Sequence, residues 1–202
     1  MRKMAKTACV AAIATAALAM LVGVTQARRF SISSFSTRMV WQQMRFSSGL
    51  IPISCDVTLE GTLHERNITK RFETLVGYIT RAEAEECSGG QVTLLTETLP
   101  WHTRYSSFSG TLPNITSMNL ITQFRIQIRP TGQMACLAET TNIIPAIYSL
   151  VLMGSEVIEV FWATAGQLPL NMGCLWGTRL RLFGSGSVTV LGGASRVSIS
   201  LI

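Results

Sequence analysis

The 202-residue chain is apolar and modestly basic, with 48% hydrophobic and 14% charged residues and with 17 Lys and Arg against 11 Asp and Glu. Its arginines are scattered between Arg38 and Arg196 without a basic run that aromatic residues interleave. This pattern argues against a nucleic-acid-binding protein, and the length suits one medium domain.

The first 27 residues have the composition of a secretory signal peptide. Three basic residues precede an alanine-rich apolar run from Thr7 to Val24, and Thr25 to Ala27 has the small-x-small form of a cleavage site. A retained membrane anchor is the alternative, because the run nearly reaches the length that spans a bilayer. Cleavage would leave residues 28–202 as one exported, only slightly basic domain without a membrane span.

The cysteines after residue 27 predict two disulfides. An even number of cysteines in an exported chain is typical of disulfide pairing, because the compartment outside the cell is oxidising. Zinc sites need close cysteine pairs, and none occurs, so no metal or other cofactor is predicted. Of the three pairings, we favour the sequential one, which ties each half of the chain once: Cys55 with Cys87, and Cys136 with Cys174.

Strand patterns begin soon after the predicted signal. Phe30 to Phe46 mixes apolar and polar residues as a strand or two would. Ile53 to Leu63 gives the clearest strand, because every second residue is apolar or glycine and Cys55 lies on that face. His64 to Thr69 is polar and is expected to connect strands.

The segment from Lys70 to Glu86 is ambiguous between a helix and a strand. Its apolar residues could share one helical face, and Ala82 to Glu86 favours a helix. Alternating β-branched and aromatic residues nevertheless favour a strand from Phe72 to Thr80, and Gly77 would weaken a helix.

The stretch from Cys87 to Tyr105 reads as turn, strand, break and strand. Ser88 to Gly90 predicts the turn, Gln91 to Glu97 the first strand, Pro100 the break and Trp101 to Phe108 the second strand. A further strand follows, marked by alternating Phe124, Ile126 and Ile128.

The second half of the chain is more apolar. Ile147 to Ala163 predicts two strands divided at Gly154-Ser155, Gly184 to Ser187 predicts a turn, and Val188 to Leu191 and Val197 to Leu201 predict the last two strands. Turn signals at a spacing of about ten residues predict an all-β fold, an antiparallel sandwich or barrel.

Two similar halves, residues 28–130 and 131–202, are one option for the domain. Gly90 to Leu95 is similar to Gly186 to Leu191, and each segment follows the second cysteine of its half. A match of six residues is also explained by coincidence, since a glycine turn before Val-Thr-Leu is common in β proteins.

No residue pattern indicates catalysis. A hydrolytic triad would place a histidine beside a nucleophile and an acid, and neither His64 nor His102 has such partners nearby in the sequence. The G-x-S-x-G motif is absent. Glu83, Glu85 and Glu86 could bind calcium, but no ligand loop accompanies them. We therefore predict no catalytic and no metal-binding residue.

Aromatic residues offer the remaining candidate site. Exposed aromatic side chains suit stacking on a sugar, whereas buried ones belong to the core. The neighbours of Trp162 and Trp176 favour the core, whereas those of Trp41 are polar. The candidate surface-binding residues are Trp101, His102 and Tyr105, with a cell-envelope glycan as the candidate partner.

Several segments resemble those of a group of small exported bacterial proteins with no assigned activity: Cys87–Gly90, Thr98–Trp101, Phe108–Ile115 and Val188–Ile202. The resemblance spans most of residues 28–202, and its motifs are a cysteine, turns and strand ends. It implies export and a β fold, and it supplies no catalytic residue. The signal also has a bacterial form, so we interpret the glycosylation-type motifs at Asn67 and Asn114 as chance.

The sequence thus predicts an exported module that binds a ligand or has a structural role, at the cell surface or outside the cell. An exported hydrolase acting on sugars or esters is the alternative, because two carboxylates need only meet in space. An eight-stranded outer-membrane barrel also fits the length, but three tyrosines are few for its aromatic girdles and the cysteines argue against it.

Overall fold

The computed structural model describes residues 29–48, 51–140, 145–164, 168–171, 174 and 179–202, so the predicted signal helix and Trp176 lie outside the described residues. The fold is all-β, as predicted. A single 3-10 turn, η1 (Thr96–Thr98), interrupts the strands, and no described helix is long and apolar enough to cross a membrane. The strands are β1 (Arg29–Ile32), β2 (Ser36–Ser48), β3 (Ile51–Leu63), β4 (Asn67–Thr69), β5 (Leu75–Ser88), β6 (Gly90–Leu94), β7 (Trp101–Thr111), β8 (Asn114–Thr122), β9 (Arg125–Pro130), β10 (Cys136–Glu139), β11 (Ala146–Met153), β12 (Glu156–Thr164), β13 (Leu168–Pro169), β14 (Arg179–Val190) and β15 (Ile199–Leu201).

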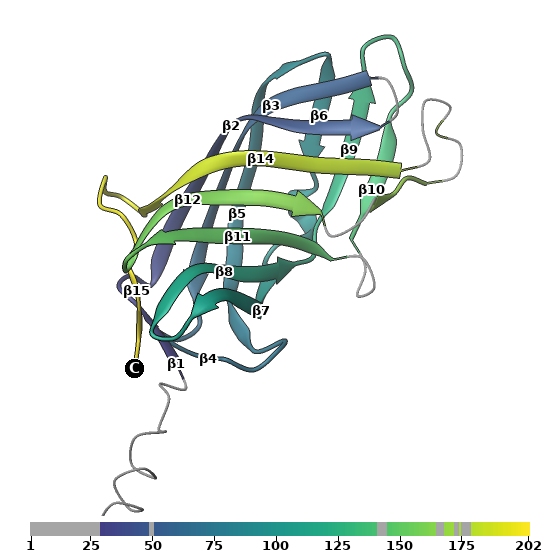
Figure 1. The fold of residues 1–202 in the computed structure, drawn as a ribbon. Helices are drawn as coiled ribbons and strands as arrows, with labels where there is room; N and C mark the ends of the chain where they lie inside the picture. The colour runs from purple at the N-terminus through teal and green to yellow at the C-terminus, as the bar shows by residue number, and fades with distance from the viewer. Residues whose placement is uncertain (1–28, 49–50, 141–144, 165–167, 172–173, 175–178) are drawn as a thin grey trace, which may run out of the picture.

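Eight of these strands form a closed antiparallel barrel. They are ordered β2, β3, β5, β7, β8, β11, β12 and β14, and β14 pairs with β12 on one side and with β2 on the other. Spatial neighbours are therefore also successive barrel strands along the chain, which Figure 1 shows as a meander. Closure leaves the barrel without an unpaired sheet edge.

Two three-stranded sheets cover the ends of the barrel. The sheet β15-β1-β4 lies at one end and β10-β9-β6 at the other (Figure 1). At the first end, the Phe30 ring lies 6.0 Å from that of Tyr105 and 5.9 Å from that of Phe108. At the second end, Phe124 and Ile126 face the barrel residue Met44 across a small void. The covering sheets thus extend the apolar core beyond the barrel.

The barrel interior is packed. Trp162 contacts Trp41 with ring centroids 5.2 Å apart and Phe124 with centroids 5.5 Å apart, and all three side chains are buried. Two interior voids have volumes of about 40 and 10 Å³, room for a few water molecules rather than for a ligand. Within the described residues, the interior therefore does not offer a small-molecule site.

One polar pair is buried beside the larger void. The Tyr148 hydroxyl donates a hydrogen bond to Thr103 Oγ1 over 3.3 Å, and both side chains are buried. Burial raises the pKa of Tyr148, because the ionised phenolate would lose its hydration.

Both predicted disulfides are confirmed. Cys55–Cys87 joins β3 to β5, and Cys136–Cys174 joins β10 to the segment before β14. The predicted face of β3 is confirmed as well, because Cys55 and its apolar neighbours Ile53, Val57 and Leu59 are buried while the intervening residues are partly exposed.

Several predicted boundaries differ from the structure. The strand β5 begins at Leu75 and continues through Ala82 to Glu86, where helix propensity was high, because pairing with β3 outweighs that weak preference. No pattern predicts β8, since Thr116 is an extra residue against β7 and interrupts the alternation. Strands from both proposed halves form one barrel. The two similar segments also occupy different places, because β6 (Gly90–Leu94) lies outside the barrel whereas Gly186 lies within it.

The predicted turn at Gly184 to Ser187 is wrong, because these residues lie inside the continuous strand β14. Glycine serves close packing there. A Cβ atom on Gly186 would overlap the Val40 carbonyl oxygen and would lie 2.9 Å from the Trp41 ring. The strand β14 passes this close to β2 because Gly186 has no side chain.

We expect Gly186→Ala to lower the free energy of unfolding by about 1–3 kcal/mol, because the obstructing carbonyl cannot rotate away as a side chain would. Gly193→Ala is the matched control, since its Cβ would lie 3.9 Å from the nearest heavy atom, and we expect a change within about 0.5 kcal/mol. Urea denaturation measures both. Equal effects of the two substitutions would show that the close approach at Gly186 is not what selects glycine.

Candidate functional site

The three candidate surface residues do not form one surface. Trp101 and Tyr105 are 4% and 3% exposed, so their prediction as surface-binding residues is wrong, whereas His102 is exposed. The physical reason is the alternation of β7, which turns Trp101, Thr103 and Tyr105 into the core and His102 outward. The polar sequence neighbours of Trp101 and Tyr105 lie on the opposite face of the strand, so they say nothing about the exposure of these two rings. Trp41 is fully buried as well.

His102 on β7 lies in an outward-facing row of three ring side chains, with Tyr78 on β5 and His64 directly after the end of β3. Its ring centroid is 5.1 Å from that of Tyr78, and the His64 ring lies 6.4 Å from Tyr78 on the other side. Both contacts are nearly perpendicular, at 81° and 85°. Tyr78 is partly exposed and both histidines are exposed, so the row presents ring surface to solvent.

Irregular pairing places Tyr78 in this row. Between Leu75 and Gly77 the register of β5 against β7 shifts by one residue, so that Val76 and Gly77 are both buried and Tyr78 faces outward. Strand pairing then aligns Tyr78 with Thr62 on β3 and with His102 on β7. A strict period of two along the sequence would have placed Val76 and Tyr78 on the same face, which is why the row was missed.

A cleft of about 280 Å³ begins at His102. It lies where the η1 turn and the start of β7 meet β9 and β10, with the buried rings of Trp101 and Phe124 along it. Its polar lining residues are Thr98, His102, Gln123, Arg125, Glu139 and Thr140. The row and the cleft share His102, so together they form one continuous candidate site.

Two hydroxyl groups that line the cleft already form hydrogen bonds within the protein. Thr98 Oγ1 accepts a hydrogen bond from Trp101 Nε1 over 2.6 Å and donates one to the Leu95 carbonyl. Thr140 Oγ1 accepts from the Phe124 amide over 2.6 Å and donates to the Phe124 carbonyl. Arg125 and Glu139, which both line the cleft, form an ion pair in which Arg125 Nε lies 3.4 Å from Glu139 Oε2.

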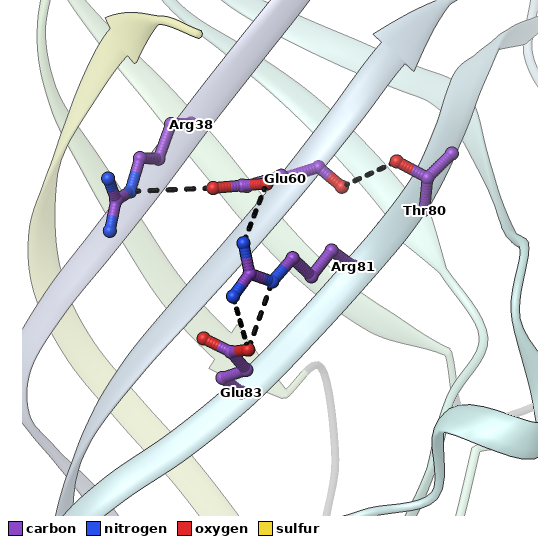
Figure 2. Close-up of polar contacts among 5 residues, drawn as sticks. All are labelled: Arg38, Glu60, Thr80, Arg81 and Glu83. Atoms are coloured by element: carbon purple, nitrogen blue, oxygen red, sulfur yellow. Dashed lines mark hydrogen bonds and ion pairs between the residues drawn. The ribbon is translucent and has the colours of Figure 1, made fainter. Parts of the chain in front are cut away.

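A network of charges continues the same outer wall across β2, β3 and β5. Figure 2 shows Glu60 on β3 between Arg38 and Arg81, 3.7 Å from a guanidinium nitrogen of each. Arg81 also donates to Glu83 Oε1 over 2.6 Å, and this hydrogen bond, together with the charges of Glu83 and Glu60, raises the pKa of Arg81. Because positive and negative side chains are paired across the strands, this part of the wall is a polar surface of mixed charge rather than a patch of one sign.

The described residues do not bring together the groups of a hydrolytic site. Neither histidine side chain makes a hydrogen bond to a hydroxyl or a carboxylate there, and the cleft threonines are engaged with the backbone. Glu83 of the acidic cluster is paired with Arg81, and no group of three potential ligand side chains in the described ranges could hold a metal ion. The ring side chains of the row and the polar side chains of the cleft, Arg125 among them, are groups that could contact a polar ligand.

Comparison of the chain with protein-family models, with curated proteins and with solved structures finds no match. The resemblance to small exported bacterial proteins therefore stays a prediction.

Proposed function

We propose that this protein is an exported binding module that holds a glycan chain on the outer wall of the barrel, along the row His64, Tyr78 and His102 and into the adjoining cleft. The observation that carries this proposal is the row itself, in which partly exposed rings lie side by side on a polar wall. Sugars offer both C–H surface that packs on rings and hydroxyls that bond to polar groups, and the row with the cleft offers both kinds of contact.

Export is supported by two features. The two disulfides are typical of proteins outside the cell, because the cytosol keeps thiols reduced. The predicted signal at residues 1–27 agrees with them. A cell-envelope glycan is a ligand that an exported module would meet, at the cell surface or after secretion.

Binding is favoured over hydrolysis by the state of the polar groups. A hydrolase of esters needs a nucleophile beside a base, and the cleft hydroxyls of Thr98 and Thr140 are already bonded to the backbone. A glycosidase needs two carboxyl groups facing one another across the sugar. Among the described residues that line the cleft, Glu139 is the one carboxylate, and it is paired with Arg125.

The experiment is a glycan-array screen of residues 28–202, followed by calorimetric titration of the strongest ligand. We expect Tyr78→Ala to weaken binding by about tenfold or more, because Tyr78 is the centre of the row and an aromatic anchor carries a large share of binding energy.

Phe161→Ala is the matched control. Phe161 is an exposed aromatic residue on β12, four strands away from β5 in either direction around the barrel. We expect this variant to bind as the wild type does. Equal weakening by both substitutions, or no binding by the wild type to any glycan, would contradict the proposal, and thermal melts of both variants check that each one folds.

A further inference from the structure

Arg125 lines the cleft with a partly exposed side chain. The side chain is 40% exposed, while its Nε atom is enclosed and lies 3.4 Å from Glu139 Oε2. Within the described part of the chain, its two terminal nitrogens make no hydrogen bond, and the Glu139 carboxylate comes nearest to the group at Nε. The NH1–NH2 edge is therefore open to a hydrogen-bond acceptor.

We propose that this open edge binds a carboxylate of the ligand, so that the glycan is an acidic one that contains uronic acid. This inference rests on the proposed function. A guanidinium edge and a carboxylate match as two parallel hydrogen bonds, a geometry that a neutral hydroxyl cannot provide. Uronic carboxylates are ionised near neutral pH, as ordinary carboxyl groups are.

The size and position of the cleft agree with this ligand. Its volume of about 280 Å³ is near the lower end of small-ligand sites, and it opens at His102, where the row of rings ends. A chain that packs along the row would thus continue into the cleft that Arg125 lines. Arg125 would act there as the residue that determines specificity, and Glu139 as a positioning residue that holds the guanidinium group against the wall.

The surrounding charges do not oppose a carboxylate. Arg104 lies two residues after His102 on β7 and borders an adjoining hollow together with Glu73. Each of the two arginines is thus accompanied by one glutamate, and His102 lines both the cleft and the hollow. Since the Glu139 charge already faces Arg125 Nε, a ligand carboxylate at the opposite edge lies away from it.

The test compares acidic oligosaccharides with their carboxyl-reduced forms, using trisaccharides of galacturonate, glucuronate and mannuronate in calorimetric titrations. We expect the wild type to bind at least one acidic form about tenfold more tightly than its reduced form, because a hydrogen-bonded charge is lost with the carboxylate. Arg125→Gln should remove this preference, so that the acidic and the reduced forms bind the variant with equal affinity. Arg125→Lys should restore only part of it, because lysine lacks the planar fork.

The outcomes separate the two proposals. Binding of acidic and reduced forms with equal affinity would overturn the carboxylate inference and leave the glycan site standing. Preference that survives in Arg125→Gln would place the carboxylate elsewhere and overturn the inference as well. Binding of no form, together with a negative glycan array, would overturn both proposals. Thermal melts show whether the variants keep the wild-type fold.

Discussion

Trp41→Ala should lower the free energy of unfolding by about 3–5 kcal/mol, the largest effect we expect from a single substitution. Trp41 is fully buried inside the barrel, where it contacts Trp162 edge to face, and Gly186 leaves room for its ring. Truncation removes this packing and opens a cavity that the closed sheet cannot collapse to fill. Urea denaturation followed by circular dichroism measures the loss.

Trp41→Phe separates packing from hydrogen bonding. Within the described residues the Trp41 Nε1 atom has no hydrogen-bond partner, so phenylalanine removes an unpaired buried donor and keeps part of the ring. We expect Trp41→Phe to lose less than half as much stability as Trp41→Ala. Losses of similar size would show that ring packing at this position is not what the barrel depends on.

Replacing both Cys55 and Cys87 with alanine should lower the free energy of unfolding by about 3–4 kcal/mol, because the disulfide closes a loop of 32 residues in the unfolded chain. The two cysteines lie on neighbouring barrel strands, so the loss should appear in the main unfolding transition. Chemical denaturation of the oxidised wild type and of the double variant measures it.

The double alanine variant of Cys136 and Cys174 is the comparison, since that disulfide closes a loop of 38 residues. The chain-entropy account predicts a loss of similar size, because loop length enters only through its logarithm. A loss below about 1 kcal/mol for the first variant would contradict the account of that disulfide as a major constraint on the unfolded chain.

Uninterrupted alternation made the fold predictable. Ile53 to Leu63 alternates without a break and forms β3, and Ile147 to Ala163 divides at Gly154-Ser155 into β11 and β12 as predicted. The even number of cysteines after the predicted signal peptide predicted the disulfides, and sequential pairing was correct. Which strands close the barrel depends on pairings between residues far apart in the chain, and local patterns do not encode those.

Interrupted alternation explains what the sequence did not reveal. The register shift near Val76 turns Tyr78 outward, and the glycines of β14 mark a close approach to β2 rather than a turn. Of the candidate site residues, only His102 is at the surface, because alternation shows that Trp101 and Tyr105 share a face but not which face is buried. The row emerged only once β3 and β7 were placed on either side of Tyr78.

We propose that the ligand binds to the outer wall formed by β5, β7 and the end of β3. Nuclear magnetic resonance titration of isotope-labelled protein with the strongest glycan from the array locates the binding surface. We expect the largest chemical-shift changes at His64, Tyr78 and His102 and along the cleft to Arg125. Shifts concentrated instead on the opposite wall, around Phe161 and Phe183, or no shifts at saturating glycan, would contradict this proposal.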